Sequence, residues 1–178
     1  MLASVVGSTV WVYGLRTAYP RYDVVVPDTF HGMRPLSGSP LNDQVEWAVA
    51  QAPEGLTAFG HVYGDPATNT GRVGAYGWTG DMHEMSPDML RSFADSLRAG
   101  VEQFGVTVDD SWQPDAGPGG GWMECMDYTA FDGSRQATCL WGDKGSVGTV
   151  LFPDPNLVGD ADRLTRELRT ALVHPSQS

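Results

Sequence analysis

The chain has 178 residues, of which 41% are hydrophobic and 19% are charged, and these values are typical of a single globular domain rather than a disordered segment. Its net charge is −11 with only 11 basic residues, which argues against a nucleic-acid partner because phosphate recognition needs clustered Lys and Arg. The 22 glycines and 12 prolines indicate many tight turns and favour a sheet-rich domain over a helical bundle.

The start of the chain carries no charged side chain before Arg16. Fifteen helical residues would span about 22 Å, short of the roughly 30 Å hydrocarbon core of a bilayer. Trp11 and Tyr13 resemble the aromatic belt at a membrane interface. We therefore expect residues 1–20 to be a short or truncated membrane anchor and residues 21–178 to be one extracytoplasmic domain. The alternative is an N-terminal strand of that domain, because the segment also contains several β-formers.

The next elements are short and separated by Pro- and Gly-containing turns. The sequence predicts a strand over 22–26, a loop over 27–40, a helix over 42–52 with Asn42 as its N-cap, and a hairpin of strands 56–63 and 72–79.

The clearest helical pattern follows this hairpin. Ser86 is a suitable N-cap, Pro87 suits the first helical position, and Gly105 ends the pattern. Six apolar residues recur at spacings of three and four: Leu90, Phe93, Ala94, Leu97, Val101 and Phe104. This stripe predicts an amphipathic helix that packs one face on the core.

The only two cysteines lie in two strand-like runs, 121–130 and 134–143. A three-residue hairpin loop that ends in Gly133, with this glycine in the left-handed conformation, puts Cys125 directly opposite Cys139. Opposed residues lie about 4.5 to 5.5 Å apart between Cα atoms, within the range of a disulfide. We therefore expect a disulfide and, with it, an oxidising compartment. Two buried free thiols are the alternative.

Alternation along these two strands assigns their side chains to opposite faces. Trp141 and Asp143 share the face of the cysteines, and a Trp beside a disulfide indicates the core. Trp122, Glu124 and Tyr128 share the other face. We expect these three residues either to form a binding patch or to be covered by a helix, and the helical content favours coverage.

The C-terminal third contains one more strand and one more helix. The sequence predicts an acidic connection over 109–121, a strand over 148–152, a helix that begins after Asp160 and a frayed end at 174–178. In this helix we expect Leu164, Leu168, Ala171 and Leu172 to face the core and Arg163, Arg166 and Arg169 to face water. The order of elements predicts an α+β fold, with an antiparallel sheet of hairpins and about three helices packed on it.

Two short motifs accompany the anchor-like start. One is Pro-Asp-Thr-x-x-Gly, and the other is Cys-x-Trp-x-Asp-x-x-x-x-Gly near the C-terminus. Their residues are Pro27, Asp28, Thr29 and Gly32, and Cys139, Trp141, Asp143 and Gly148. In these features the chain resembles a group of uncharacterised membrane-anchored extracytoplasmic proteins of actinobacteria. The resemblance implies an anchored domain outside the membrane with a cysteine pair, and it implies no activity. For the fold, a PsbP-like sandwich serves as an analogy only.

Patterns that carry chemistry are sparse. Asp81, His83 and Glu84 are the best candidates for a metal or acid–base cluster, although such residues are also typical of a polar loop before a helix. The sequence around Ser146 is not Gly-x-Ser-x-Gly, and the glycines at 117–121 lack the spacing of a nucleotide-binding loop. We therefore expect no catalytic residue and no cofactor.

These observations predict a non-catalytic domain on the extracytoplasmic side of the cell membrane, tethered through its N-terminus. Its expected role is interaction or ligand sensing, with a protein or a small molecule as partner. Two other classes stay open, namely a secreted or envelope hydrolase that uses acidic residues and a structural module of the cell envelope. An exposed aromatic surface would favour binding, and a titratable group of shifted pKa in a concave site would favour an enzyme.

Overall fold

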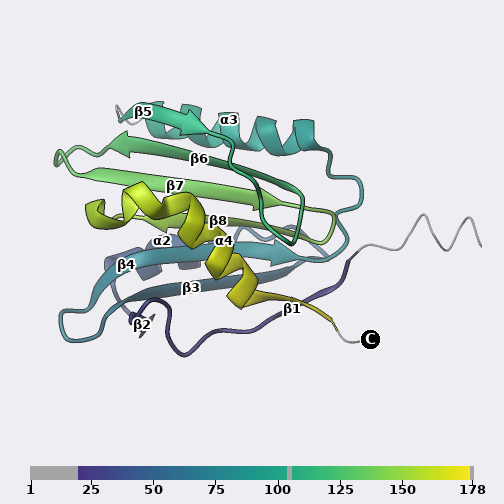
Figure 1. Cartoon of the computed structure of the whole chain (residues 1–178), viewed down its shortest axis with the longest axis horizontal. Helices are drawn as coiled ribbons and strands as arrows, with labels where there is room; N and C mark the ends of the chain where they lie inside the picture. Colours follow the sequence, from purple (N-terminus) through teal and green to yellow (C-terminus); the bar gives the residue numbers. More distant parts are fainter. Residues whose placement is uncertain (1–19, 104–105, 177–178) are drawn as a thin grey trace, which may run out of the picture.

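The computed structural model describes residues 20–103 and 106–176. A seven-stranded antiparallel sheet has the strand order β2-β3-β4-β8-β7-β6-β5, and β1 pairs with β9 in a separate two-stranded sheet (Figure 1). The elements are β1 (Tyr22–Val24), β2 (Arg34–Leu36), α2 (Pro40–Val49), β3 (Thr57–Asp65), β4 (Thr70–Thr79), α3 (Pro87–Gln103), β5 (Thr107–Trp112), β6 (Trp122–Thr129), β7 (Arg135–Gly142), β8 (Ser146–Phe152), a 3₁₀-helix (Pro155–Asp160), α4 (Ala161–Leu172) and β9 (Val173–Pro175). The predicted α+β fold is confirmed.

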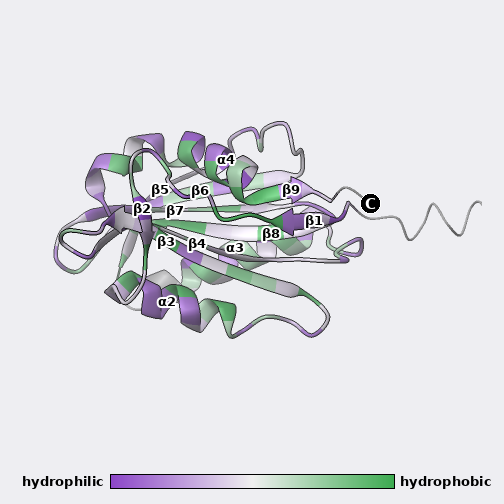
Figure 2. Ribbon diagram, turned by 90° about the horizontal axis from the view of Figure 1, so that it is seen from below, coloured by the Kyte–Doolittle hydropathy of each residue, from purple (hydrophilic) through white to green (hydrophobic). Residues whose placement is uncertain are grey.

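The α-helices cover both faces of the large sheet (Figure 2). On one face α4 packs on β7, and on the other α2 packs on β3 and β4 while α3 packs on β5 and β6. The sheet is therefore the middle layer of three, and alternate residues of each strand belong to different interfaces.

The β6–β7 hairpin has the predicted register. Cys125 pairs with Cys139 across the two strands, and a disulfide joins them with their Cα atoms 4.0 Å apart. In the loop, the Gly133 N–H donates to the Ala130 carbonyl, and Gly133 has a φ of 80°, a conformation that glycine adopts without strain. The N–H of Ala130 donates to Ser134, which closes the ladder. Local turn chemistry therefore set the pairing that brings the two sulfurs together.

The main core lies between the sheet and α4. Trp141 is completely buried there and stacks on Phe59, with ring centroids 6.3 Å apart. Gly148 pairs with Trp141 on the neighbouring strand, and a Cβ at this glycine would lie 2.2 Å from the Trp141 ring. Only glycine leaves room for the indole, so the Trp and the Gly of the C-terminal motif form one packing unit.

The predicted helix after Ser86 is confirmed as α3. The Ser86 hydroxyl oxygen accepts a hydrogen bond from the Met89 N–H at 3.2 Å, as expected of an N-cap. Leu90 and Ala94 of the apolar stripe are buried, and Phe93 and Leu97 are half-buried. The side chain of Val101, and Phe104 and Gly105, lie outside the described part of the chain.

Four local predictions were wrong. Helix α2 begins at Pro40 and has Ser39 as its N-cap, while Asn42 lies one turn inside and accepts from the Ser39 N–H at 2.9 Å. Short strands occupy three segments that were predicted to be irregular: β2 within 27–40, β5 at the start of 109–121, and β9 at the C-terminal end. β2 and β5 are edge strands of the large sheet and β9 pairs only with β1, so polar residues and proline are tolerated there.

The predicted anchor cannot be compared with the structure, because residues 1–19 lie outside the described residues. Within residues 20–103 and 106–176, no helix combines the length and the apolar character needed to cross a bilayer.

Candidate ligand-binding site

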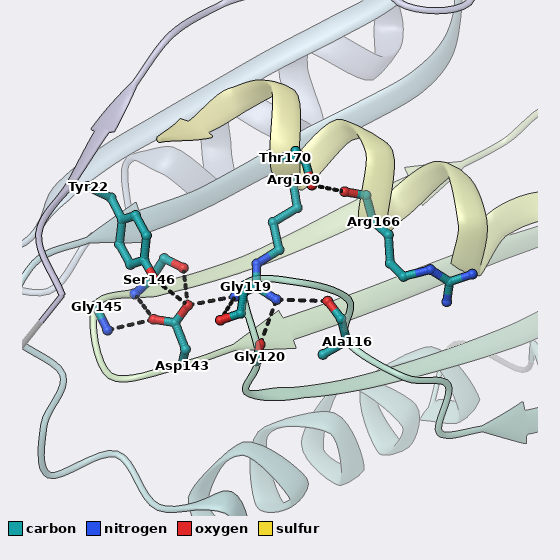
Figure 3. A network of polar contacts seen from close by, with 10 residues as sticks. All are labelled: Tyr22, Ala116, Gly119, Gly120, Asp143, Gly145, Ser146, Arg166, Arg169 and Thr170. Carbon is teal, nitrogen blue, oxygen red and sulfur yellow. Dashed lines mark hydrogen bonds and ion pairs between the residues drawn. The ribbon is translucent and has the colours of Figure 1, made fainter. Parts of the chain in front are cut away.

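A buried ion pair lies where the β7–β8 turn meets α4 and the loop before β6 (Figure 3). Nη2 of Arg169 donates to Oδ2 of Asp143 at 2.6 Å, and both side chains are more than nine-tenths buried. Arg169 was predicted to face water, and this prediction was wrong. Asp143 is the first residue after β7 and its side chain is buried, so its carboxylate needs a cation beside it.

The turn itself occupies the remaining acceptor sites of Asp143. Oδ1 accepts the backbone N–H groups of Gly145 and Ser146 at 2.6 and 2.8 Å, and Oδ2 accepts the Ser146 hydroxyl at 3.1 Å. The Tyr22 hydroxyl also donates to Oδ2, at 3.2 Å. A carboxylate offers about four lone-pair sites, so Asp143 has none left for a substrate.

Both terminal nitrogens of the Arg169 guanidinium also have hydrogen-bond partners. Its Nη1 donates to the carbonyl oxygens of Ala116 and Gly120 at 3.1 and 2.9 Å, and Nη2 reaches the Gly119 carbonyl at 3.5 Å (Figure 3). The Gly-rich stretch before β6 thus turns its carbonyl groups toward a cation of the protein, the reverse of a phosphate-binding loop, which presents N–H groups. Arg169 fixes this loop against α4.

Tyr22 connects the network to the N-terminal part of the domain. Burial raises the pKa of its phenol, and the neighbouring Asp143 carboxylate raises that pKa further. The hydroxyl therefore stays protonated and remains a donor to Asp143. Through this bond the start of β1 is held against the β7–β8 turn.

Two cavities border this network and share Tyr22 and Gly119 in their linings. The first, with a volume of about 400 Å³, is lined mainly by residues of α4 and β9 and of the 116–119 loop. The second, which we call the Trp122 pocket, has a volume of about 450 Å³. Its lining residues are Pro20, Tyr22, Met85, Pro87, Leu90, Gly119, Gly121, Trp122, Gly142, Asp143 and Lys144.

The Trp122 pocket is mainly apolar and has a small polar edge. Met85, Pro87 and Leu90 come from the start of α3 and the residues before it, and Trp122 comes from the first position of β6. The indole N–H of Trp122 is buried and has no hydrogen-bond acceptor among the described residues. Lys144, the single lysine of the chain, is exposed beside it. Such a lining suits an apolar ligand body that carries one acceptor or negative group.

The predicted binding patch is divided by α3. Trp122 lines the Trp122 pocket, whereas Tyr128 lies at the other end of β6, half-buried. Glu124 lies between them and is only 6% exposed. Its carboxylate accepts from Arg98 of α3 at 3.0 Å and from Gln113 at 3.1 Å. The three residues share one sheet face, but the structure does not bring them together as one surface.

The three candidate metal ligands lie in the loop before α3. His83 Nδ1 lies 2.6 Å from Asp81 Oδ1, and the exposed Glu84 reaches only 3.8 Å from His83 Nε2. The hydrogen bonds from the His83 side chain and backbone lower the pKa of Asp81. Within the described residues, no group of three or more His, Cys, Asp or Glu side chains has a geometry that could hold a metal ion.

No protein-family model, curated protein or solved structure matches the chain. The resemblance to the actinobacterial group therefore rests only on the anchor-like start and the motif residues. In the structure, Trp141 and Gly148 of that motif pack together, and Asp143 holds the β7–β8 turn and Arg169.

Sequence reasoning missed Arg169 and Tyr22 as parts of this site. A signal for Arg169 was present, because the sequence predicts Asp143 on the core face of the run 134–143, and a buried carboxylate there needs a cation. Nothing in the sequence identified which arginine supplies it, since Arg169 lies 26 residues from Asp143 and Tyr22 lies 121 residues away.

Proposed function

We propose that this chain is a non-catalytic domain on the extracytoplasmic side of the cell membrane, tethered through its N-terminal segment, which binds a small and largely apolar molecule in the Trp122 pocket. The pocket carries the proposal. Its volume of about 450 Å³ is that of a small-molecule site, where apolar walls surround a few polar groups. The polar network behind it is complete without a ligand, so the pocket is preformed.

The chemistry of the site favours binding over hydrolysis. Asp143 is the acidic residue of the pocket, and its oxygens are taken up by Arg169, Tyr22 and the turn. The Ser146 hydroxyl donates to this same carboxylate, and among the described residues no histidine bonds to either side chain. A serine nucleophile needs a free base beside it, so this pair does not form a catalytic unit.

Two features support the proposed location on the extracytoplasmic side of the membrane. The Cys125–Cys139 bond is of the kind that persists in oxidising compartments. Pro20, the first described residue, lines the Trp122 pocket. A tether that continues N-terminally from Pro20 would place the pocket close to the membrane, where apolar ligands concentrate.

The ligand site can be tested with 1-anilinonaphthalene-8-sulfonate, a fluorescent probe with an apolar body and one negative group. We expect the full chain to bind one probe molecule saturably, and Met85→Trp, which fills the pocket, to weaken binding at least tenfold. Met89→Trp is the control, because Met89 is 55% exposed on α3 and does not line this pocket. Equal effects of the two variants, or non-saturable binding, would contradict the ligand site.

The tether is tested separately by fractionating cells that express the full chain. We expect the protein to sediment with membranes and to stay there after a high-salt wash, because an apolar anchor is not displaced by salt. Recovery in the soluble fraction would contradict the tether and leave the ligand site untouched.

A further inference from the structure

A second concave surface lies on the sheet face that α2 and α3 share, and we call it the α2–α3 groove. It has a volume of about 670 Å³ and is lined by Asp43, Gln44, Trp47 and Ala48 of α2, Tyr76 of β4, Val106, Tyr128 of β6 and Leu151 of β8. It has no lining residue in common with the Trp122 pocket. It is therefore a separate site and does not depend on the proposed function.

Three aromatic side chains from three different elements line this groove. Trp47 is 70% exposed, although it is the largest apolar side chain of α2. Tyr76 and Tyr128 are half-buried on strands that are separated by β8 and β7. Burial raises the pKa of Tyr76, so its phenol stays neutral at physiological pH. The exposed Trp47 ring therefore offers an electron-rich face to a ligand in a groove that the two Tyr side chains also line.

The charge of the groove is negative. Asp43 is exposed at its edge and makes no ion pair with any described residue. None of the described residues that line the groove is Lys or Arg. The net charge of the chain, −11, adds to the negative potential around the groove. An anionic ligand would be repelled there and a cationic ligand attracted.

We propose that the α2–α3 groove binds a small organic cation of the choline type, with a quaternary ammonium group over the ring of Trp47 and beside Asp43, which lies one helical turn away on the same face of α2. A cation over the face of an aromatic ring is attracted by the ring quadrupole within about 6 Å of its centroid, and Trp is the strongest of the three ring types. Methylated ammonium groups are weakly hydrated and gain from the apolar contacts with Ala48, Val106 and Leu151. Asp43 supplies the compensating charge.

The proposal is tested by isothermal titration of the full chain with choline and with 3,3-dimethyl-1-butanol, which has the same shape without the charge. We expect saturable binding of choline and at least fivefold weaker binding of the neutral compound, because only the cation gains from the rings and the carboxylate. Equal affinities would show a purely apolar groove and would overturn the proposal.

Three variants locate the site. We expect Trp47→Ala to weaken choline binding at least fivefold, and Asp43→Asn to weaken it several-fold. Glu46→Gln is the matched control, because Glu46 is an exposed acid of the same helix that does not line the groove. Trp47 and Asp43 are both exposed, so the variants should keep the circular dichroism of the parent. Equal losses for Asp43→Asn and Glu46→Gln would mean that net charge alone attracts the ligand and would overturn the site.

Two further titrations distinguish a free organic cation from two other ligands, a phosphatidylcholine membrane and a neutral sugar. Vesicles of phosphatidylcholine that bind while free choline does not would mean that the surface recognises a membrane, and would overturn a small-molecule site. Binding of neutral monosaccharides with the same dependence on Trp47 would mean that the rings stack on sugars, and would also overturn it.

Discussion

The two faces of the central sheet are built from the same strands but bury their aromatic side chains to different degrees. Figure 2 shows α4 on one face and α2 on the other. On the α4 face Cys125, Cys139 and Trp141 are completely buried. On the α2–α3 face Tyr76 and Tyr128 stay half-buried and Trp47 of α2 projects into solvent. The α4 face contains a disulfide and a buried ion pair, which constrain it, and the other face leaves apolar and aromatic surface free for recognition.

The largest effect that we expect is on the α4 face at Arg169. Arg169→Met leaves the buried Asp143 carboxylate without its cation, and loss of one partner of a buried ion pair costs about 3–5 kcal/mol of unfolding free energy. The measurement is urea denaturation of the full chain. The double variant Asp143→Asn/Arg169→Met removes both charges and should be more stable than the single variant. A single variant as stable as the parent would contradict this account of the network.

The next effect is on the disulfide of the same face. Replacing Cys125 and Cys139 by Ala should lower the unfolding free energy by about 2–4 kcal/mol and keep the fold, because the bond closes a short loop within one hairpin. Thiol labelling of unfolded, unreduced protein from its own compartment should find no free thiol. Two labelled thiols per chain would contradict both the bond and the oxidising compartment.

A smaller effect that depends on pH is expected at the outer edge of α4. The hydrogen bond from His31 at 2.5 Å, and a second from Arg163, lower the pKa of Glu167 below its ordinary value of 4.5. A depressed carboxylate pKa stabilises the fold above the pKa of the unfolded chain, and this stabilisation is lost as the pH falls through the folded pKa. Urea midpoints between pH 6 and 3 should therefore fall less steeply in His31→Ala than in the parent. Identical slopes would contradict the coupling.

The smallest change in unfolding free energy is expected on the α2–α3 face. Trp47→Ala should change the unfolding free energy by no more than about 0.5 kcal/mol, because an exposed side chain has little packing to lose. Phe131→Ala, at an exposed position of the β6–β7 loop, is the matched control in the same melt. A large loss at Trp47 alone would mean that the indole packs in the fold rather than serving a ligand.

The sequence by itself determined the elements that depend on near neighbours. Ser86 and Pro87 start α3, because a cap and a fixed φ act within one turn. Gly133 fixes the β6–β7 register, and that register alone aligns Cys125 with Cys139. These interactions have short range along the chain, so they can be identified from the order of residues.

Only the tertiary structure decided which side chains meet across the sheet. The sequence predicted that all the arginines of α4 face water. Arg169 is buried instead, because it binds Asp143 and the carbonyl groups of the 116–120 loop, none of which is near it in sequence. The groove likewise joins Trp47, Tyr76 and Tyr128 from a helix and two separated strands. Such contacts depend on how the layers pack, and residue spacing along one element does not contain that information.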